Sequence, residues 1–191
     1  RVRLAALDIA AGQPDAALTR LDGVLTDVPD QPQALLLRAT VRYSQQRWGE
    51  AIADLRGTLR RLPDDERALL LLAQVYLQQG DAVLAKDAYR QLLNAMPDSA
   101  EALRSLALLL AREGELGEAE NLLRQRLKGS PEDVQAGAVL VQVLIQRQQL
   151  DAAEQEARRL VDLGSGTGLA RMALADVLSA RGRHGEAAAA Y

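Results

Sequence analysis

A step of 34 residues repeats along the whole chain and restricts its fold more than any other feature. Pro29, Pro63, Pro97 and Pro131 follow one another at this step. Alanine repeats at the same step in three interlocked series, which are Ala17, Ala51, Ala85, Ala119, Ala153 and Ala187; Ala34, Ala68, Ala102, Ala136 and Ala170; and Ala5, Ala39, Ala73, Ala107 and Ala175, with Val141 in the remaining place. One alanine series could arise by chance in an alanine-rich chain, but three series and four prolines could not. The chain is therefore an array of similar units.

Within each unit the apolar residues predict two helices joined by a turn. In the third unit, apolar side chains at helical spacing form one stripe before the turn at Gly80 and a second stripe after it. The first stripe holds Leu69, Leu72, Ala73 and Tyr76, and the second holds Ala85, Tyr89, Leu92 and Leu93. Gly12, Gly114 and Gly182 occupy the same turn in other units, where a helix end favours positive φ. We expect the alanines to lie where two helices cross closely, with neighbouring hairpins closing the core between them.

The bulk composition excludes several classes of protein. The net charge of −3 and a pI near 5.3 give no electrostatic reason to expect nucleic-acid binding. The chain has no cysteine, so it has neither disulfides nor thiolate metal sites. No apolar run is long enough for a membrane span, and we expect no direct membrane insertion by this segment. The first residue is Arg1 rather than Met, which favours a segment of a longer protein.

Catalytic constellations are sparse. His184 is the only histidine, and no metal-binding motif such as HExxH occurs. The acidic pairs Asp64–Asp65 and Glu132–Asp133 stand at expected helix starts, where they complement the helix dipole. The loop 164–168 resembles a phosphate-binding loop only in its glycine and serine content, and because no strand precedes it we expect a flexible turn between units. We therefore expect no enzyme, no cofactor and no metal.

These patterns resemble the tetratricopeptide repeat family, whose period is also 34 residues. The resemblance rests on the Leu-Ala pair of the first helix, the turn glycine, the second-helix alanine and the closing proline. It covers the whole chain as a single solenoid, with units 1–31 (partial), 32–65, 66–99, 100–133, 134–167 and 168–191 (partial). It implies an all-α, right-handed superhelical solenoid of about six helix-turn-helix repeats, four complete and two truncated. It also implies protein or peptide binding rather than catalysis.

The family's geometry assigns a concave groove to the first helices. Carried over position by position, it gives the partner-binding residues Leu36, Thr40, Tyr43, Leu70, Gln74, Leu77, Leu108, Arg112, Gln142 and Ile145. It also places Leu37 and Leu71 on this face. The Lys/Asn clamp by which some members hold acidic chaperone C-termini is absent, because those positions carry Leu, Ala, Gln and Ser. What remains is an apolar lane edged by amides, which fits an amphipathic helix or an extended apolar segment.

Several residues depart from the pattern. Arg38 and Arg42 occupy places that are apolar in other units, and two interpretations are open. Either their stems cover apolar surface while their heads reach solvent or Asp8, or they form a functional basic spot. Gly137 replaces a large residue, which predicts a thin place or a close backbone approach. For helix starts, the sequence predicts a cap at Ser130 before Pro131 and a capping box from Asp98.

We expect an interaction scaffold within a larger bacterial multidomain protein. The preference for Arg over Lys and the Ala/Leu richness favour a bacterial source. The resemblance to long alanine-rich tetratricopeptide repeat arrays implies the periplasm or cell envelope, as in exopolysaccharide secretion, with the cytoplasm as the alternative. A structural spacer that positions flanking domains without any groove ligand is the competing hypothesis. Neither the partner's identity nor the oligomeric state follows from the sequence.

Overall fold

The computed structural model describes residues 1–164 and 167–190, and this part of the chain contains only helices. The chain consists of two compact bodies. Residues 1–97 are here called the N-terminal body and residues 98–191 the C-terminal body. The N-terminal body contains α1 (Val2–Ala10), α2 (Pro14–Asp27), α3 (Pro32–Ser44), α4 (Trp48–Arg61), α5 (Glu66–Gln78) and α6 (Ala82–Ala95). The C-terminal body contains α7 (Ala100–Arg112), α8 (Leu116–Gly129), α9 (Val134–Gln146), α10 (Leu150–Asp162), α11 (Thr167–Ala180) and α12 (His184–Ala190).

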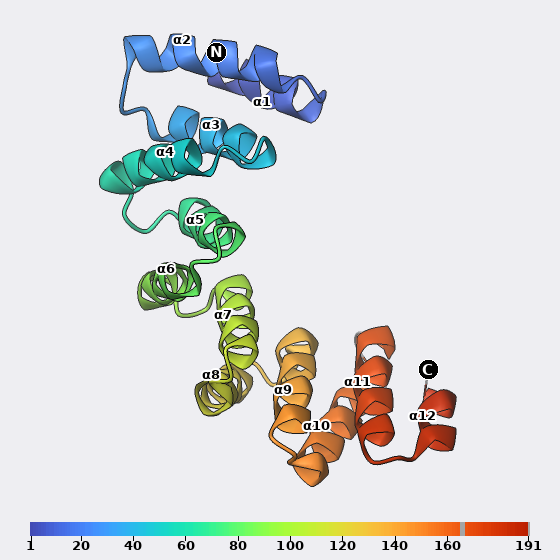
Figure 1. The fold of residues 1–191 in the computed structure, drawn as a ribbon. Helices are drawn as coiled ribbons and strands as arrows, with labels where there is room; N and C mark the ends of the chain where they lie inside the picture. The colour runs from blue at the N-terminus through green and yellow to red at the C-terminus, as the bar shows by residue number, and fades with distance from the viewer. Residues whose placement is uncertain (165–166, 191) are drawn as a thin grey trace. The chain divides into compact units, whose positions relative to one another are not determined.

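Consecutive helices form hairpins within each body (Figure 1). In the N-terminal body α1, α3 and α5 contact one another in sequence order, and α2 and α4 each pack against the first helix of the next hairpin. The C-terminal body repeats the arrangement, with α7, α9 and α11 in sequence order and α8 and α10 against the next hairpin. The all-α repeat architecture predicted from the sequence is confirmed. The right-handed course of the superhelix stays a prediction.

The alanine series occupy the core. Every member of the three series is almost fully buried, as is Val141 in the one place without alanine. A methyl group at these positions lets two helix backbones approach closely, while fully buried leucines such as Leu21, Leu55 and Leu92 fill the remaining space. The packing role predicted for the alanines is therefore confirmed.

The helix ends follow the 34-residue step with one correction. Gln31, Asp65, Ser99 and Asp133 are spaced by that step, and each accepts a hydrogen bond from the backbone N–H three residues on. The predicted caps at Asp98 and Ser130 are wrong, because a turn that contains the proline separates the second helix from the next unit and places the cap after it. The capping residue is therefore the second residue after each proline rather than a neighbour of it.

Gly137 lies where the sequence predicts a close approach. A Cβ atom at this position would stand 2.5 Å from Cδ2 of Leu160, a side chain that is fully buried. Leu160 of the neighbouring helix α10 lies beside this glycine, whose equivalents Leu35, Leu69 and Leu103 carry large side chains. Close packing, rather than a thin place, explains this glycine.

Candidate partner-binding cavity

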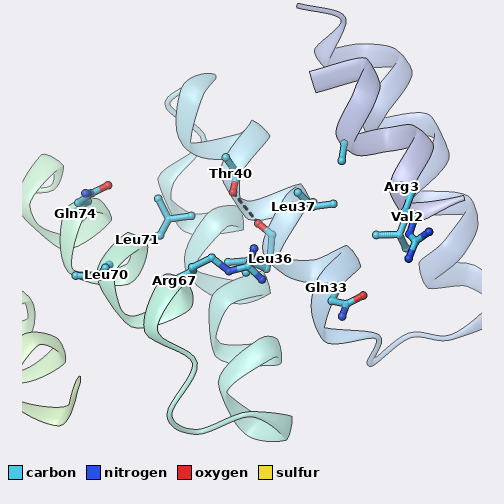
Figure 2. A pocket seen from close by; sticks show the side chains of 11 residues that line it. Val2, Arg3, Gln33, Leu36, Leu37, Thr40, Arg67, Leu70, Leu71 and Gln74 are labelled. Atoms are coloured by element: carbon cyan, nitrogen blue, oxygen red, sulfur yellow. Dashed lines mark hydrogen bonds between the residues drawn. The ribbon is translucent and has the colours of Figure 1, made fainter. Parts of the chain in front are cut away.

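An open cavity of about 580 Å³ lies on the face formed by α1, α3 and α5 of the N-terminal body. Figure 2 shows its lining, with Val2 and Arg3 on α1, Leu36 and Leu37 on α3, and Leu70, Leu71 and Gln74 on α5. The complete lining is Val2, Arg3, Ala6, Gln33, Leu36, Leu37, Thr40, Arg67, Leu70, Leu71 and Gln74. Its floor is apolar, and its edges carry amides and two arginines.

The 34-residue register explains which side chains meet here. The lining residues fall into four groups whose members are 34 residues apart, which are 2, 36 and 70; 3, 37 and 71; 6, 40 and 74; and 33 and 67. Successive first helices present equivalent positions to the same side because their hairpins stack in the same orientation. The cavity is therefore a product of the repeat.

Four of the predicted groove residues line this cavity, which are Leu36, Thr40, Leu70 and Gln74. Leu36 is only 5% exposed, so it forms part of the floor rather than an accessible contact. The Thr40 hydroxyl donates to the carbonyl oxygen of Leu36 at 2.9 Å (Figure 2), so the amides of Gln33 and Gln74 are the better donors for a partner.

The other predicted residues lie elsewhere. Tyr43 packs its ring on Trp48, at 5.3 Å between ring centroids, and Leu77 is half-buried outside the cavity lining. In the C-terminal body, Leu108, Arg112 and Gln142 are exposed, and Ile145 is half-buried. Their role in binding stays a prediction.

Five lining residues were missed, which are Val2, Arg3, Ala6, Gln33 and Arg67. The signal was present in the sequence, because Arg3 lies one period before the predicted groove residue Leu37, and Val2 and Ala6 one period before Leu36 and Thr40. The predicted groove began at the first complete unit and so left out α1, while Gln33 and Arg67 lie one helical turn before Leu37 and Leu71.

Arg38 and Arg42 are neither a basic binding spot nor partners of Asp8. Both guanidinium groups bind the carboxylate of Asp54, which is 3% exposed, with N–O distances of 2.7 Å. The hydrogen bond from Arg38 to Asp54 raises the pKa of that guanidinium despite its partial burial. Asp8 pairs instead with Arg20 at 2.5 Å. Both interpretations from the sequence overlooked Asp54, because it lies on the second helix of the same hairpin, where neighbouring repeats carry Arg20 and Ala88.

Nothing in the described ranges 1–164 and 167–190 resembles a metal centre, since no group of three or more His, Cys, Asp and Glu side chains comes together. Among the same residues no helix is long and apolar enough to cross a bilayer. His184 is exposed at the start of α12. Of the loop 164–168, residues 165 and 166 lie outside the described residues.

Comparison with family models decides the affiliation. Tetratricopeptide repeat models match residues 2–66, 42–109, 110–167 and 168–191, and so cover nearly the whole chain. The chain belongs to the tetratricopeptide repeat family. The family is a protein-interaction fold rather than an enzyme fold, which supports the general expectation for this chain.

Solved structures show the same fold at low sequence identity. A tetratricopeptide repeat protein from Parabacteroides merdae superposes with a TM-score of 0.81 at 20% identity, covering 99% of this chain and 75% of that one. MamA gives 0.75 at 16% identity, covering 86% of this chain and 96% of its own. YrrB, described as a tetratricopeptide repeat protein with an unusual peptide-binding site, gives 0.70 at 18% identity over 88% and 87% of the two chains. A search of curated proteins finds no match.

Proposed function

We propose that this tetratricopeptide repeat chain is an interaction scaffold that binds a helix or peptide of a partner protein on its first-helix face. The cavity formed by α1, α3 and α5 carries the proposal, because its floor is apolar and its amides stand at the edges. Burying leucine surface there would release about 25 cal/mol per Å² of apolar area. The peptide-binding site described for YrrB supports the same use of the fold.

The test compares two substitutions of the same kind. Leu70→Glu places a charge in the cavity, and because Leu70 is only half-buried the fold should tolerate it. Val83→Glu is the matched control, since Val83 is 63% exposed on α6 and outside the cavity. After a partner is isolated by cross-linking and mass spectrometry, its affinity for both variants is measured by calorimetry. Loss of binding by Leu70→Glu alone supports the proposal.

If the chain is a spacer without a groove ligand, the binding measurements on these variants should give a different result. Binding that survives Leu70→Glu in a chain with unchanged circular dichroism would remove this cavity from consideration. Leu108→Glu tests the predicted contacts in the C-terminal body in the same way, because Leu108 is 47% exposed. Binding that survives this change would remove those contacts from consideration. A spacer would tolerate all of these changes and respond only to deletion of a whole repeat.

We also propose that the chain belongs to a larger bacterial protein of the cell envelope, as in exopolysaccharide secretion. The bacterial source is supported by the preference for arginine over lysine and by the alanine and leucine content, and the envelope location is supported by the resemblance to long alanine-rich arrays of this family. Cell fractionation of the source organism with an antibody against the chain tests it. Recovery in the cytoplasmic fraction alone would contradict it.

A further inference from the structure

The charges around the cavity of the N-terminal body are unbalanced. Arg3 and Arg67 stand at its edges, and no acidic residue lines it. Figure 2 shows Arg3 on the α1 side, while the Arg67 side chain extends from α5 toward α3. Two positive charges beside an apolar floor form a recognition surface rather than an inert one.

These two arginines differ from most others in the part of the chain that the structure describes. Arg20, Arg61 and Arg104 are typical of the majority, because each lies within 3 Å of a carboxylate. Neither Arg3 nor Arg67 has a hydrogen bond or ion pair within residues 1–164 and 167–190. Their guanidinium groups are free to bind a carboxylate from outside the chain.

The C-terminal body provides an internal comparison. On α7, the position equivalent to Gln33 and Arg67 is Glu101, and the position equivalent to Leu36 and Leu70 is Arg104. Glu101 and Arg104 bind each other at 2.8 Å. Arg104 on α7 is therefore paired with a carboxylate of its own helix, whereas Arg3 on α1 and Arg67 on α5 have no such partner.

The apolar floor favours a helix over an extended strand as the occupant. An extended peptide needs hydrogen-bond partners along its whole backbone, whereas the amides of this cavity stand at its edges and its floor is apolar. A helix satisfies its backbone internally and needs only an apolar stripe to cover the leucines. Because α1 and α5 flank α3, the axes of the helices that carry the two arginines lie about two helix spacings apart, roughly 18 Å, which is the longest span expected between the two charges because Arg67 extends toward α3. That span corresponds to about 12 residues of a helix, or three turns.

We propose that the occupant is an amphipathic helix of a partner protein whose leucine stripe is flanked at both ends by an acidic residue. The stripe covers Leu36, Leu37, Leu70 and Leu71, and the two carboxylates bind Arg3 and Arg67. This inference rests on the function proposed above and adds the chemistry of the partner. It also gives that helix an orientation across the first helices, because the arginines lie on α1 and α5.

The experiment uses the full chain and three synthetic fluorescein-labelled helices that share one leucine stripe. The first carries Glu at both ends of the stripe, about 11 residues apart so that both lie on the leucine face; the second carries Gln there, and the third Lys. Anisotropy titration should give an affinity for the Glu peptide about tenfold above the Gln peptide, with the Lys peptide weaker still. The advantage of the Glu peptide should shrink as salt is raised.

Removing the two arginine charges from the protein distinguishes direct contacts with the peptide carboxylates from a general electrostatic attraction. Arg3→Gln with Arg67→Gln should bring the Glu peptide down to the affinity of the Gln peptide. The control, Arg60→Gln with Arg171→Gln, removes the same charge from exposed arginines outside the cavity and should leave the ratio unchanged. Equal effects of the two double variants would overturn the inference, and so would failure of all three peptides to bind. If the three peptides bind equally and Leu70→Glu weakens all of them, the proposed function stands and the acidic partner is wrong.

Discussion

At the turn inside each hairpin one residue adopts a left-handed backbone, and the chain does not always supply glycine there. Gly12, Gly80, Gly114 and Gly182 have φ between 70° and 83°, as the sequence predicts. Gln46 and Gln148 occupy the same place in the register with φ of 60°. A side chain in this conformation costs roughly 1 kcal/mol relative to glycine.

We therefore expect Gln46→Gly to raise the free energy of unfolding by about 1 kcal/mol. Gln45→Gly is the matched control, because Gln45 has φ of −87° and gains nothing from glycine. Urea unfolding followed by circular dichroism measures both. Equal shifts in the two variants would show that the left-handed turn stores no strain.

Two helical glycines with different surroundings give a second prediction. Gly23 has open space around a new Cβ atom, whereas Gly137 has Leu160 at 2.5 Å and Glu156 at 3.1 Å. Gly23→Ala should stabilise by about 1 kcal/mol through helix propensity. In Gly137→Ala the same gain is opposed by overpacking of roughly 1–3 kcal/mol, so this variant should melt lower than the parent. Thermal melting checks the pair, and a higher melting temperature for Gly137→Ala would refute the close packing.

At the scale of helices, buried carboxylates on the second helices of the hairpins link these helices to neighbouring elements. Glu120 on α8 binds Arg124 of its own helix and Arg147 at the next hairpin turn. Glu154 on α10 repeats this one period later with Arg158 and Arg181. The network around Asp54 fills the corresponding role in the N-terminal body by a different route, through two arginines of α3.

Asp54→Asn should destabilise the protein by roughly 3 kcal/mol, because it leaves two partly buried guanidinium groups without their shared carboxylate. Asp22→Asn removes another partner of Arg38, but Asp22 is exposed and its loss should cost under about 1 kcal/mol. Chemical denaturation of both variants at neutral pH measures the difference. Similar costs would mean that burial does not set the value of these ion pairs.

The cap of α9 gives a prediction for acid conditions. Burial opposes ionisation of Asp133, but the N–H of Ala136 and the guanidinium of Arg126 outweigh it and lower the pKa of Asp133. The stabilisation is therefore complete above the ordinary aspartate pKa near 4 and is lost as the pH falls through the lower pKa of the folded state. Asn keeps the cap and loses the charge, so Asp133→Asn should cost about 1 kcal/mol at pH 7 and less at pH 3. A cost that grows on acidification would contradict this assignment, and urea unfolding at both pH values measures it.

Most of the fold could be predicted from the sequence because a repeat samples each packing environment several times. The first helices α3, α5, α7 and α9 begin one period apart, at residues 32, 66, 100 and 134. Features that occur in only one repeat could not be predicted from this recurrence. The pairing of Arg38 and Arg42 with Asp54 joins two helices whose relative rotation no periodicity reveals. At the binding face the register specified the equivalent positions, but which of them stay open depends on local packing, as the floor position of Leu36 and the stacking of Tyr43 on Trp48 show.

At the scale of the whole molecule, each helix contacts only its near neighbours within a body. Stability in such an array is approximately a sum of hairpin terms and nearest-neighbour terms, so a local defect should have a local effect. Two substitutions test this, one in each body: Asp54→Asn in the N-terminal body and Glu154→Gln in the C-terminal body. Both remove a buried carboxylate that binds two or more arginines.

Hydrogen exchange read by mass spectrometry should therefore separate the two variants along the chain. Asp54→Asn should lower the protection of α3 and α4 by up to about 100-fold, which corresponds to roughly 3 kcal/mol, and leave α9 and α10 near the parent level. Glu154→Gln should produce the reverse pattern, because its carboxylate joins α10 to the turn between α11 and α12. Uniform loss of protection over both bodies in either variant would show instead that the chain opens as one cooperative unit, and the additive description would then be wrong.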